Sequence, residues 1–293
     1  MTMDTKPPFT EHLVPSGQGN VYAREYAGSG PAFLLLHGFP DNLHIYDELI
    51  PHLTNAGRRV VSFDFLGYGA SDKPTGMRYN FRQQQDDLEA VITAFHLNKI
   101  VPVGHDAGGP AAINFALDHP DRVSSMCLLN TFYGAAPTIR LPELIEIFAT
   151  PKLKALVDAI LESPEQLAFL LRFQQMKFMK TLPEQYHASF ESILAPIINN
   201  NFNFGRKAGS GPAFAEMTAQ VYEEVARNTL RLPKLETLDI PVKLIWGEAD
   251  LDLNTGVAQD LQSHLMAASL VVLPAGHWLQ VDAPEAVAKE MLS

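Results

Sequence analysis

Asp106 stands at the centre of segment 103–109, which reads VGHDAGG. The segment follows the apolar run 100–103 and precedes small residues that are typical of a helix. Where a strand turns sharply into a helix, the central side chain is exposed at the sheet edge, and small flanking residues relieve the crowding. This pattern predicts that Asp106 is a nucleophile in the position where a serine more often stands.

A carboxylate as the nucleophile limits the kinds of substrate that the site could attack. A carboxylate that attacked an acyl carbon would form a mixed anhydride, which is a poor resting intermediate. Attack on a saturated carbon that carries a leaving group instead gives an alkyl ester, which water can later cleave. The residue type therefore favours epoxides and alkyl halides as substrates over carboxylic esters.

A carboxylate nucleophile needs a base that activates water and an acid that orients this base. His277 lies in the sequence AGHW, just after the last apolar strand pattern, and Asp250 lies in WGEAD, just after the preceding one. We predict that His277 is the base and that Asp250 holds its imidazole. Glu248 and Asp252 are the alternatives for the acid.

Two backbone N–H groups are expected to form an oxyanion hole. The turn 37–40, HGFP, follows the strand pattern 32–36, so the expected donors are Phe39 and Ala107, the residue after the nucleophile. His105 should point away from Asp106 in the sharp turn. We therefore interpret it, and likewise His37, as structural.

The composition limits the class of protein. The chain has 293 residues, 46% hydrophobic and 19% charged, which suits one large α/β domain with an insertion. The net charge of -11 argues against a nucleic-acid partner. The single cysteine, Cys127, excludes an internal disulfide and lies in a buried strand pattern. No run has the length of a signal peptide or a membrane span, so we expect a cytoplasmic protein without a membrane partner.

Short β-rich runs alternate with helical patterns from residue 32 onward, which predicts a parallel sheet covered on both faces. After Asn130 the chain becomes helical and is cut by prolines, with loops expected at 199–203 and 209–211. We predict a core made of 1–133 and 234–293 and a helical cap at 134–233. The expected elements are a hairpin at 12–26, strands at 32–36, 59–63, 100–103, 123–129, 242–246 and 269–273, a helix at 81–95 and a last helix from Ala283.

Five segments together carry a resemblance: 37–40, 64–72 (DFLGYGASD), 104–109, 246–250 and 276–278. Their order along the chain is nucleophile, acid, histidine. They resemble the branch of the α/β-hydrolases that holds epoxide hydrolases and haloalkane dehalogenases. The resemblance implies an α/β fold with a mostly parallel eight-stranded sheet and a helical cap over the active site. It also implies no metal and no organic cofactor.

The resemblance further suggests how the leaving group is handled. Epoxide hydrolases typically polarise the epoxide oxygen with two cap tyrosines, and this implies Tyr222 as one candidate donor. The place of the other falls on Phe169, which cannot donate, so Tyr186 and Tyr133 are the alternatives. We expect Phe39, Trp278 and Phe169 to line the substrate pocket.

Haloalkane dehalogenases usually hold the halide with a tryptophan after the nucleophile and a donor after the HG pair, whereas this chain has Ala107 and Phe39 there. Fluoroacetate dehalogenases carry an arginine where Ala107 stands. The sequence thus favours an epoxide hydrolase acting on a small apolar molecule. A haloalkane or haloacid dehalogenase is the alternative, and a binding protein that recognises a small ligand without turnover is a third.

Overall fold

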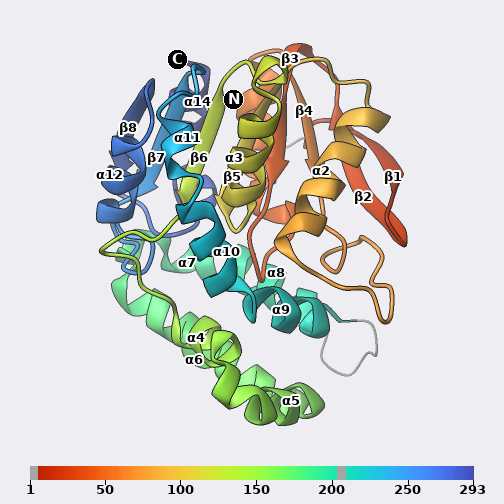
Figure 1. Ribbon diagram of the computed structural model, residues 1–293, viewed down its shortest axis with the longest axis vertical. Helices are drawn as coiled ribbons and strands as arrows, with labels where there is room; N and C mark the ends of the chain where they lie inside the picture. Colours follow the sequence, from red (N-terminus) through yellow and green to blue (C-terminus); the bar gives the residue numbers. More distant parts are fainter. Residues whose placement is uncertain (1–5, 203–208) are drawn as a thin grey trace.

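An eight-stranded sheet forms the centre of the molecule, in the order β1-β2-β4-β3-β5-β6-β7-β8 (Figure 1). The computed structural model describes residues 6–202 and 209–293. Strands β3 to β8 run parallel, while β2 pairs antiparallel with β1 and β4, which confirms the predicted mostly parallel sheet. The strands are β1 (Thr10–Ser16), β2 (Gly19–Tyr26), β3 (Ser29–Leu36), β4 (Arg58–Phe63), β5 (Ile100–Asp106), β6 (Met126–Thr131), β7 (Val242–Gly247) and β8 (Ala268–Leu273).

The central strands are apolar because both of their faces are covered. Every residue of β6 is buried, and so is every residue of β5 except Asp106 at its end. The strand expected at 123–129 begins only at Met126, because Val123 makes an isolated bridge with Ile100 before the regular pairing starts. The carboxyl ends of the parallel strands meet at one edge of the sheet.

The core helices lie on the sheet. Helices α2 and α3 pack against each other in front of it in Figure 1, whereas α1 contacts β4, α14 contacts β7, and these two helices also contact each other. The apolar face of α2 is buried, as its spacing predicted, but Gln84, Gln85 and Asp87 are buried as well instead of facing solvent. The core helices are α1 (Ile50–Asn55), α2 (Phe81–Ala94), α3 (Gly108–Asp118), α12 (Thr255–Ser263), α13 (Leu279–Asp282) and α14 (Pro284–Leu292).

A helical insertion follows β6 and returns to the core at β7, where it lies below the sheet in Figure 1. One expected loop is a helix instead: Asn199 to Phe202 belong to α8, and the remaining expected loop residue, Asn203, lies outside the described residues. The insertion holds α4 (Glu143–Ala149), α5 (Lys154–Glu162), α6 (Pro164–Thr181), α7 (His187–Ser189), α8 (Ala195–Phe202), α9 (Gly211–Thr218), α10 (Val221–Thr229) and α11 (Leu232–Leu235). None of the helices in 6–202 and 209–293 has the length and hydropathy to cross a membrane.

Candidate active site

Asp106 is the last residue of β5 and takes a left-handed backbone, with φ of 48°. This conformation is costly for a residue with a Cβ and persists only where the surroundings enforce it. Here a Cβ on Gly104 would lie 2.7 Å from Gly109 Cα, and a Cβ on Gly38 would lie 2.4 Å from Asp106 Cβ. The Thr131 hydroxyl donates to the Asp106 carbonyl at 2.5 Å. The sharp turn expected around Asp106 is therefore present and tightly packed.

The two carboxylate oxygens of Asp106 have different surroundings. The Ala107 N–H donates to Oδ1 at 2.5 Å, and the Phe39 N–H lies near enough to this carboxylate to help lower its pKa. Oδ2 lies 3.8 Å from Nε2 of His277. Burial raises the pKa of Asp106 to about 6, although the positive charge of His277 and the two N–H groups act to lower it. One oxygen is thus held by the backbone, and the other faces the histidine.

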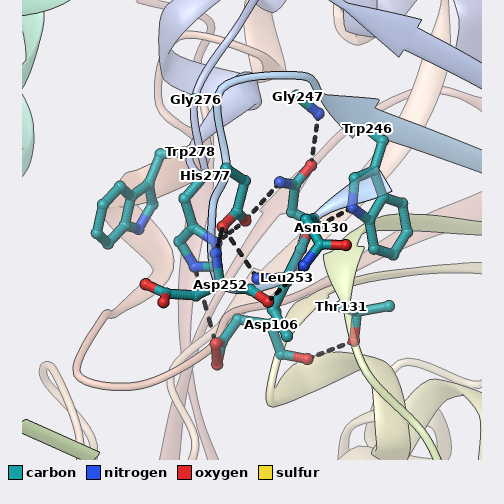
Figure 2. Close-up of polar contacts among 12 residues, drawn as sticks. Asp106, Asn130, Thr131, Trp246, Gly247, Asp252, Leu253, Gly276, His277 and Trp278 are labelled. Carbon is teal, nitrogen blue, oxygen red and sulfur yellow. Dashed lines mark hydrogen bonds and ion pairs between the residues drawn. The ribbon is translucent and has the colours of Figure 1, made fainter. Parts of the chain in front are cut away.

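His277 lies between two carboxylates (Figure 2). Its Nδ1 donates to Oδ2 of Asp250 at 2.7 Å, on the side of the ring away from Asp106. Burial alone would lower the pKa of His277, but Asp250 and Asp106 outweigh burial and raise the pKa to about 9. At neutral pH the resting imidazole is therefore positively charged.

Asp250 lies three residues beyond the end of β7 and is fully enclosed by donors. The backbone N–H groups of Asp252 and Leu253 donate to its Oδ1, each at 3.0 Å. Burial would raise the pKa of Asp250, but His277 and the donor groups lower it overall. Of the three carboxylates considered from sequence, the structure brings Asp250 into contact with the imidazole, whereas Glu248 is exposed.

Asn130, which was not among the residues predicted from the sequence, completes this arrangement (Figure 2). Its side-chain amide donates to Asp250 Oδ2 at 2.6 Å, and its side-chain oxygen accepts the Gly247 N–H at 2.7 Å. Asn130 has φ of 33° and lies where the pairing of β5 with β6 skips one residue. Such a bulge redirects a side chain. The one signal in the sequence is its position, as a polar residue directly after the apolar run 126–129.

A second missed residue is Asp41, directly after the HGFP turn. Its Oδ2 accepts the indole N–H of Trp278 at 2.9 Å and lies 3.7 Å from Nδ1 of His105. Burial raises the pKa of Asp41 to about 7. His105 is fully buried and its Nε2 contacts the His277 carbonyl at 3.0 Å, while the buried His37 accepts the Phe65 N–H at Nε2. Both histidines therefore shape loops around the site.

A pocket opens above Asp106 and His277, between the sheet edge and the insertion; we call it the apolar pocket. The insertion contributes side chains from α4, α6, α8 and α10, and most of them are aliphatic or aromatic. Phe39 and Trp278 both line it. Its full lining is Phe39, Pro40, Asp106, Phe132, Arg140, Leu141, Pro142, Leu144, Ile145, Leu171, Gln174, Gln175, Phe178, Ile198, Val221, Asp252, Leu253, His277 and Trp278.

One predicted pocket residue lies elsewhere. Phe169 is 65% exposed and lines a surface depression with Leu156 and Ile160, so the prediction that it lines the substrate pocket is wrong. The face of α6 that lines the apolar pocket is the one with Leu171 and Phe178. Phe169 is two residues from Leu171, which places it on another side of the helix.

Tyr222, predicted as the proton donor to the leaving group, does not line the apolar pocket either. Tyr222 is 51% exposed, and its neighbour Val221 is the residue of α10 that lines the apolar pocket. Tyr133 is buried but donates to Asn114, and neither Tyr133 nor Tyr186 is among the lining residues. Within the described parts of the chain, no tyrosine lines the apolar pocket.

The polar side chains of the apolar pocket are few. Asp252 lines it and has its pKa raised to about 6, by burial first and by the nearby charge of Asp250 second. Arg140 lines it as well, and none of the carboxylates that the structure describes lies within ion-pair distance of its guanidinium. In 6–202 and 209–293 we find no cluster of three or more histidine, cysteine, aspartate or glutamate side chains suited to a metal ion.

Asp106, Asp250 and His277 follow the expected order along the chain. Asp106 ends β5, and the other two lie on the loops after β7 and β8. The family described as "alpha/beta hydrolase fold" matches residues 31–284. The chain belongs to this family. The match covers the sheet from β3 onward, the whole insertion and all three site loops, and it confirms the α/β-hydrolase superfamily to which the motifs pointed.

Individual relatives point to the same group of hydrolases. Epoxide hydrolase 3 of Xenopus tropicalis is 28% identical over 286 residues, covering 90% of this chain and 72% of the relative. A fluoroacetate dehalogenase of Burkholderia sp is 44% identical over 107 residues, a local match to 35% of each chain. The crystal structure of the haloalkane dehalogenase DbeA from Bradyrhizobium elkani superposes with a TM-score of 0.76 at 20% identity, covering 97% of this chain and 96% of the other, and shows the shared fold.

Proposed function

We propose that this hydrolase opens epoxides to diols through a covalent alkyl ester on Asp106. The observation that carries the proposal is the asymmetry of this carboxylate. Its Oδ1 is held by the Ala107 N–H, while Oδ2 faces His277 beneath the apolar pocket. A nucleophile held in this way is pre-oriented toward a carbon atom in the pocket.

The reaction would proceed in two steps. In the first, Asp106 Oδ2 bonds to an epoxide carbon, the carbon–oxygen bond of the ring breaks, and the released oxygen takes a proton. In the second, the oxygen of a water molecule bonds to Cγ of Asp106 while His277 takes the water proton. The Ala107 and Phe39 N–H groups stabilise the oxyanion on Cγ. The bond from Cγ to the alcohol oxygen then breaks, and His277 returns the proton to the departing alkoxide.

The released epoxide oxygen needs an acid. No tyrosine supplies it from the described pocket lining, but Asp252 lines the pocket and its raised pKa of about 6 keeps part of its population protonated near neutral pH. The absence of a side-chain N–H on Ala107 and Phe39 leaves a departing halide without the donors that a dehalogenase usually provides. This contrast supports an epoxide over a simple haloalkane.

The covalent step is tested with His277→Gln. We expect this variant to form the ester and to hydrolyse it slowly, so that intact mass spectrometry detects protein plus one epoxide. Asp106→Asn is the matched control and should give no adduct. The proposal would be abandoned if a broad panel of epoxides gave no adduct on His277→Gln and no diol with the unaltered enzyme.

A second candidate function is the dehalogenation of a haloacid, and Arg140 is the observation that favours it. The guanidinium lines the pocket that holds Asp106 and is free of a carboxylate partner within the described chain. Arginine binds carboxylates in a bidentate geometry. The local match to a fluoroacetate dehalogenase supports the same candidate.

The two candidates are separated by assaying diol formation and halide release side by side. If haloacids are substrates, Arg140→Gln should raise KM for a haloacid by about tenfold or more. It should leave the reaction of an uncharged haloalkane or epoxide unchanged. Equal effects on charged and uncharged substrates would exclude carboxylate recognition by Arg140.

A further inference from the structure

A second cavity adjoins the apolar pocket on the other side of His277, and we call it the polar chamber. The two cavities share a wall that includes His277, Trp278, Phe178 and Asp252. Unlike the apolar pocket, the polar chamber is lined by many charged and polar side chains. Those that line the polar chamber alone include Glu143, Lys177, Thr181, Asp250 and Asp282.

Two carboxylate oxygens in the wall of the polar chamber lack a partner. Asp282 accepts the Gly276 N–H with Oδ2, but its buried Oδ1 accepts no hydrogen bond from the protein. Glu143 binds Lys177 with Oε1, while its buried Oε2 is likewise unsatisfied. Buried polar atoms without protein partners are normally satisfied by ordered water. The two oxygens are closed off from the chamber itself, and it is the charged and polar lining of the chamber that gives it the chemistry of a space that holds water.

The proposed reaction creates a need for such a space. While the ester exists, the alkyl group fills the apolar pocket directly above Asp106, so solvent has no free passage there. The second step still consumes one water molecule at Cγ of Asp106, beside Nε2 of His277. Because His277 lines both cavities, water in the polar chamber is one side chain away from the place where it reacts.

We propose that the polar chamber is the water reservoir and entry path for ester hydrolysis, separate from the apolar route by which substrate enters. This inference rests on the two-step function proposed above. It assigns the cavities to different steps: the apolar pocket governs ester formation, and the polar chamber governs ester hydrolysis.

The test fills the polar chamber without touching the reacting groups. Thr181 ends α6, lines this chamber alone, and its hydroxyl donates only to the Phe178 carbonyl. Rapid-quench intact mass spectrometry with an epoxide gives the rates of ester formation and ester hydrolysis separately. We expect Thr181→Trp to slow hydrolysis by about tenfold and to leave formation unchanged, so that the ester accumulates during turnover.

Three further variants keep the result interpretable. Thr181→Val removes the hydroxyl without adding bulk and should hydrolyse the ester at the normal rate. Ala249→Phe fills the same chamber from the opposite loop and should reproduce the effect of Thr181→Trp, which matters if that variant folds poorly. Ile145→Phe narrows the apolar pocket and should slow formation alone.

The inference is overturned if both filling variants hydrolyse the ester at the normal rate, or if both slow formation and hydrolysis equally. These results differ from a failure of the proposed function itself. In that case no ester would form on the unaltered enzyme or on His277→Gln, and the filling variants would have no intermediate to preserve.

Discussion

At the scale of single residues, the site depends on charges that change during turnover. Asp106 and Asp250 both raise the pKa of His277, and together they outweigh its burial. Once Asp106 becomes an ester, its negative charge is gone. The pKa of His277 must then fall, because one of its two stabilising partners has been neutralised. In the proposed mechanism, His277 is therefore charged in the resting enzyme and becomes a neutral base for water once the ester has formed.

The pH dependence of the first step follows from Asp106. Only the ionised carboxylate attacks, and its pKa is about 6. We therefore expect the rate of ester formation on His277→Gln to fall as the pH decreases through the pKa of Asp106, and to fall again at higher pH as Asp252, the proposed acid for the released oxygen, loses its proton. This variant lacks the cation that lowers that pKa, so the fall should begin at a higher pH than in the unaltered enzyme. Single-turnover mass spectrometry from pH 4.5 to 8 measures both profiles, and a flat profile in both would contradict the assignment.

Asn130 is expected to act by positioning Asp250. Asn130→Ala removes the donor to Asp250 Oδ2 and leaves the buried Gly247 N–H without an acceptor. The pKa of Asp250 should rise, and its hold on His277 should weaken. We expect ester hydrolysis to slow by about tenfold, with its pH profile displaced, while ester formation changes less. A merely structural role would lower stability without moving the pH profile, so thermal melting is measured alongside.

At the scale of elements, the sequence predicted the site better than the pocket. Asp106, Asp250 and His277 follow parallel strands, and the ends of such strands must meet at one edge. The residues missed, Asn130 and Asp41, depend on a bulge and on a turn after the strand. A one-residue skip in strand pairing leaves no pattern in the sequence of a single strand. The same holds for a buried carboxylate in a turn, since both features depend on the neighbouring strands.

The helices of the insertion were the least predictable part. Their helix-like sequence, cut by prolines, indicated short helices, but the face of α6 that meets the core depends on how the insertion docks. Phe169 has the apolar character expected of a pocket residue, yet it is exposed, whereas Gln174, a polar residue, is buried at the pocket. Apolar residues occur on several sides of α6, so its periodicity does not single out the docked face.

The turn that carries Phe39 supports a prediction about close packing. A Cβ on Gly38 would meet Asp106 Cβ at 2.4 Å, so Gly38→Ala must displace either the nucleophile or the oxyanion turn. We expect ester formation to fall by about a hundredfold or more, since small misplacements are costly in catalysis. Gly211→Ala is the matched control, because its added methyl group would meet Leu161 at an ordinary 3.5 Å. Near-normal activity of Gly38→Ala would refute the proposed contact.

At the scale of the whole molecule, the insertion is fastened to the core at the turn that we propose as part of the oxyanion hole. Asn201, on α8, is buried, and its side-chain amide donates to the Pro40 carbonyl at 2.5 Å. Its side-chain oxygen accepts the Asn42 amide and the Gly69 N–H, each at 3.1 Å. One asparagine of the insertion thus binds two core loops beside Phe39, which couples the position of the insertion to the donor that faces Asp106.

Asn201→Ala tests this coupling. The change leaves the Pro40 carbonyl and the Gly69 N–H unsatisfied, and we expect a loss of about 1–3 kcal/mol in the free energy of unfolding, measured by urea denaturation. Because the Phe39 turn is released at the same time, ester formation should also slow. Asn200→Ala on the same helix is the control and should leave both quantities close to normal, since Asn200 is exposed. If Asn201→Ala lost stability but kept the normal rate of ester formation, Asn201 would hold the insertion at this turn without affecting the position of the Phe39 N–H. The insertion would then contribute to catalysis through substrate access alone.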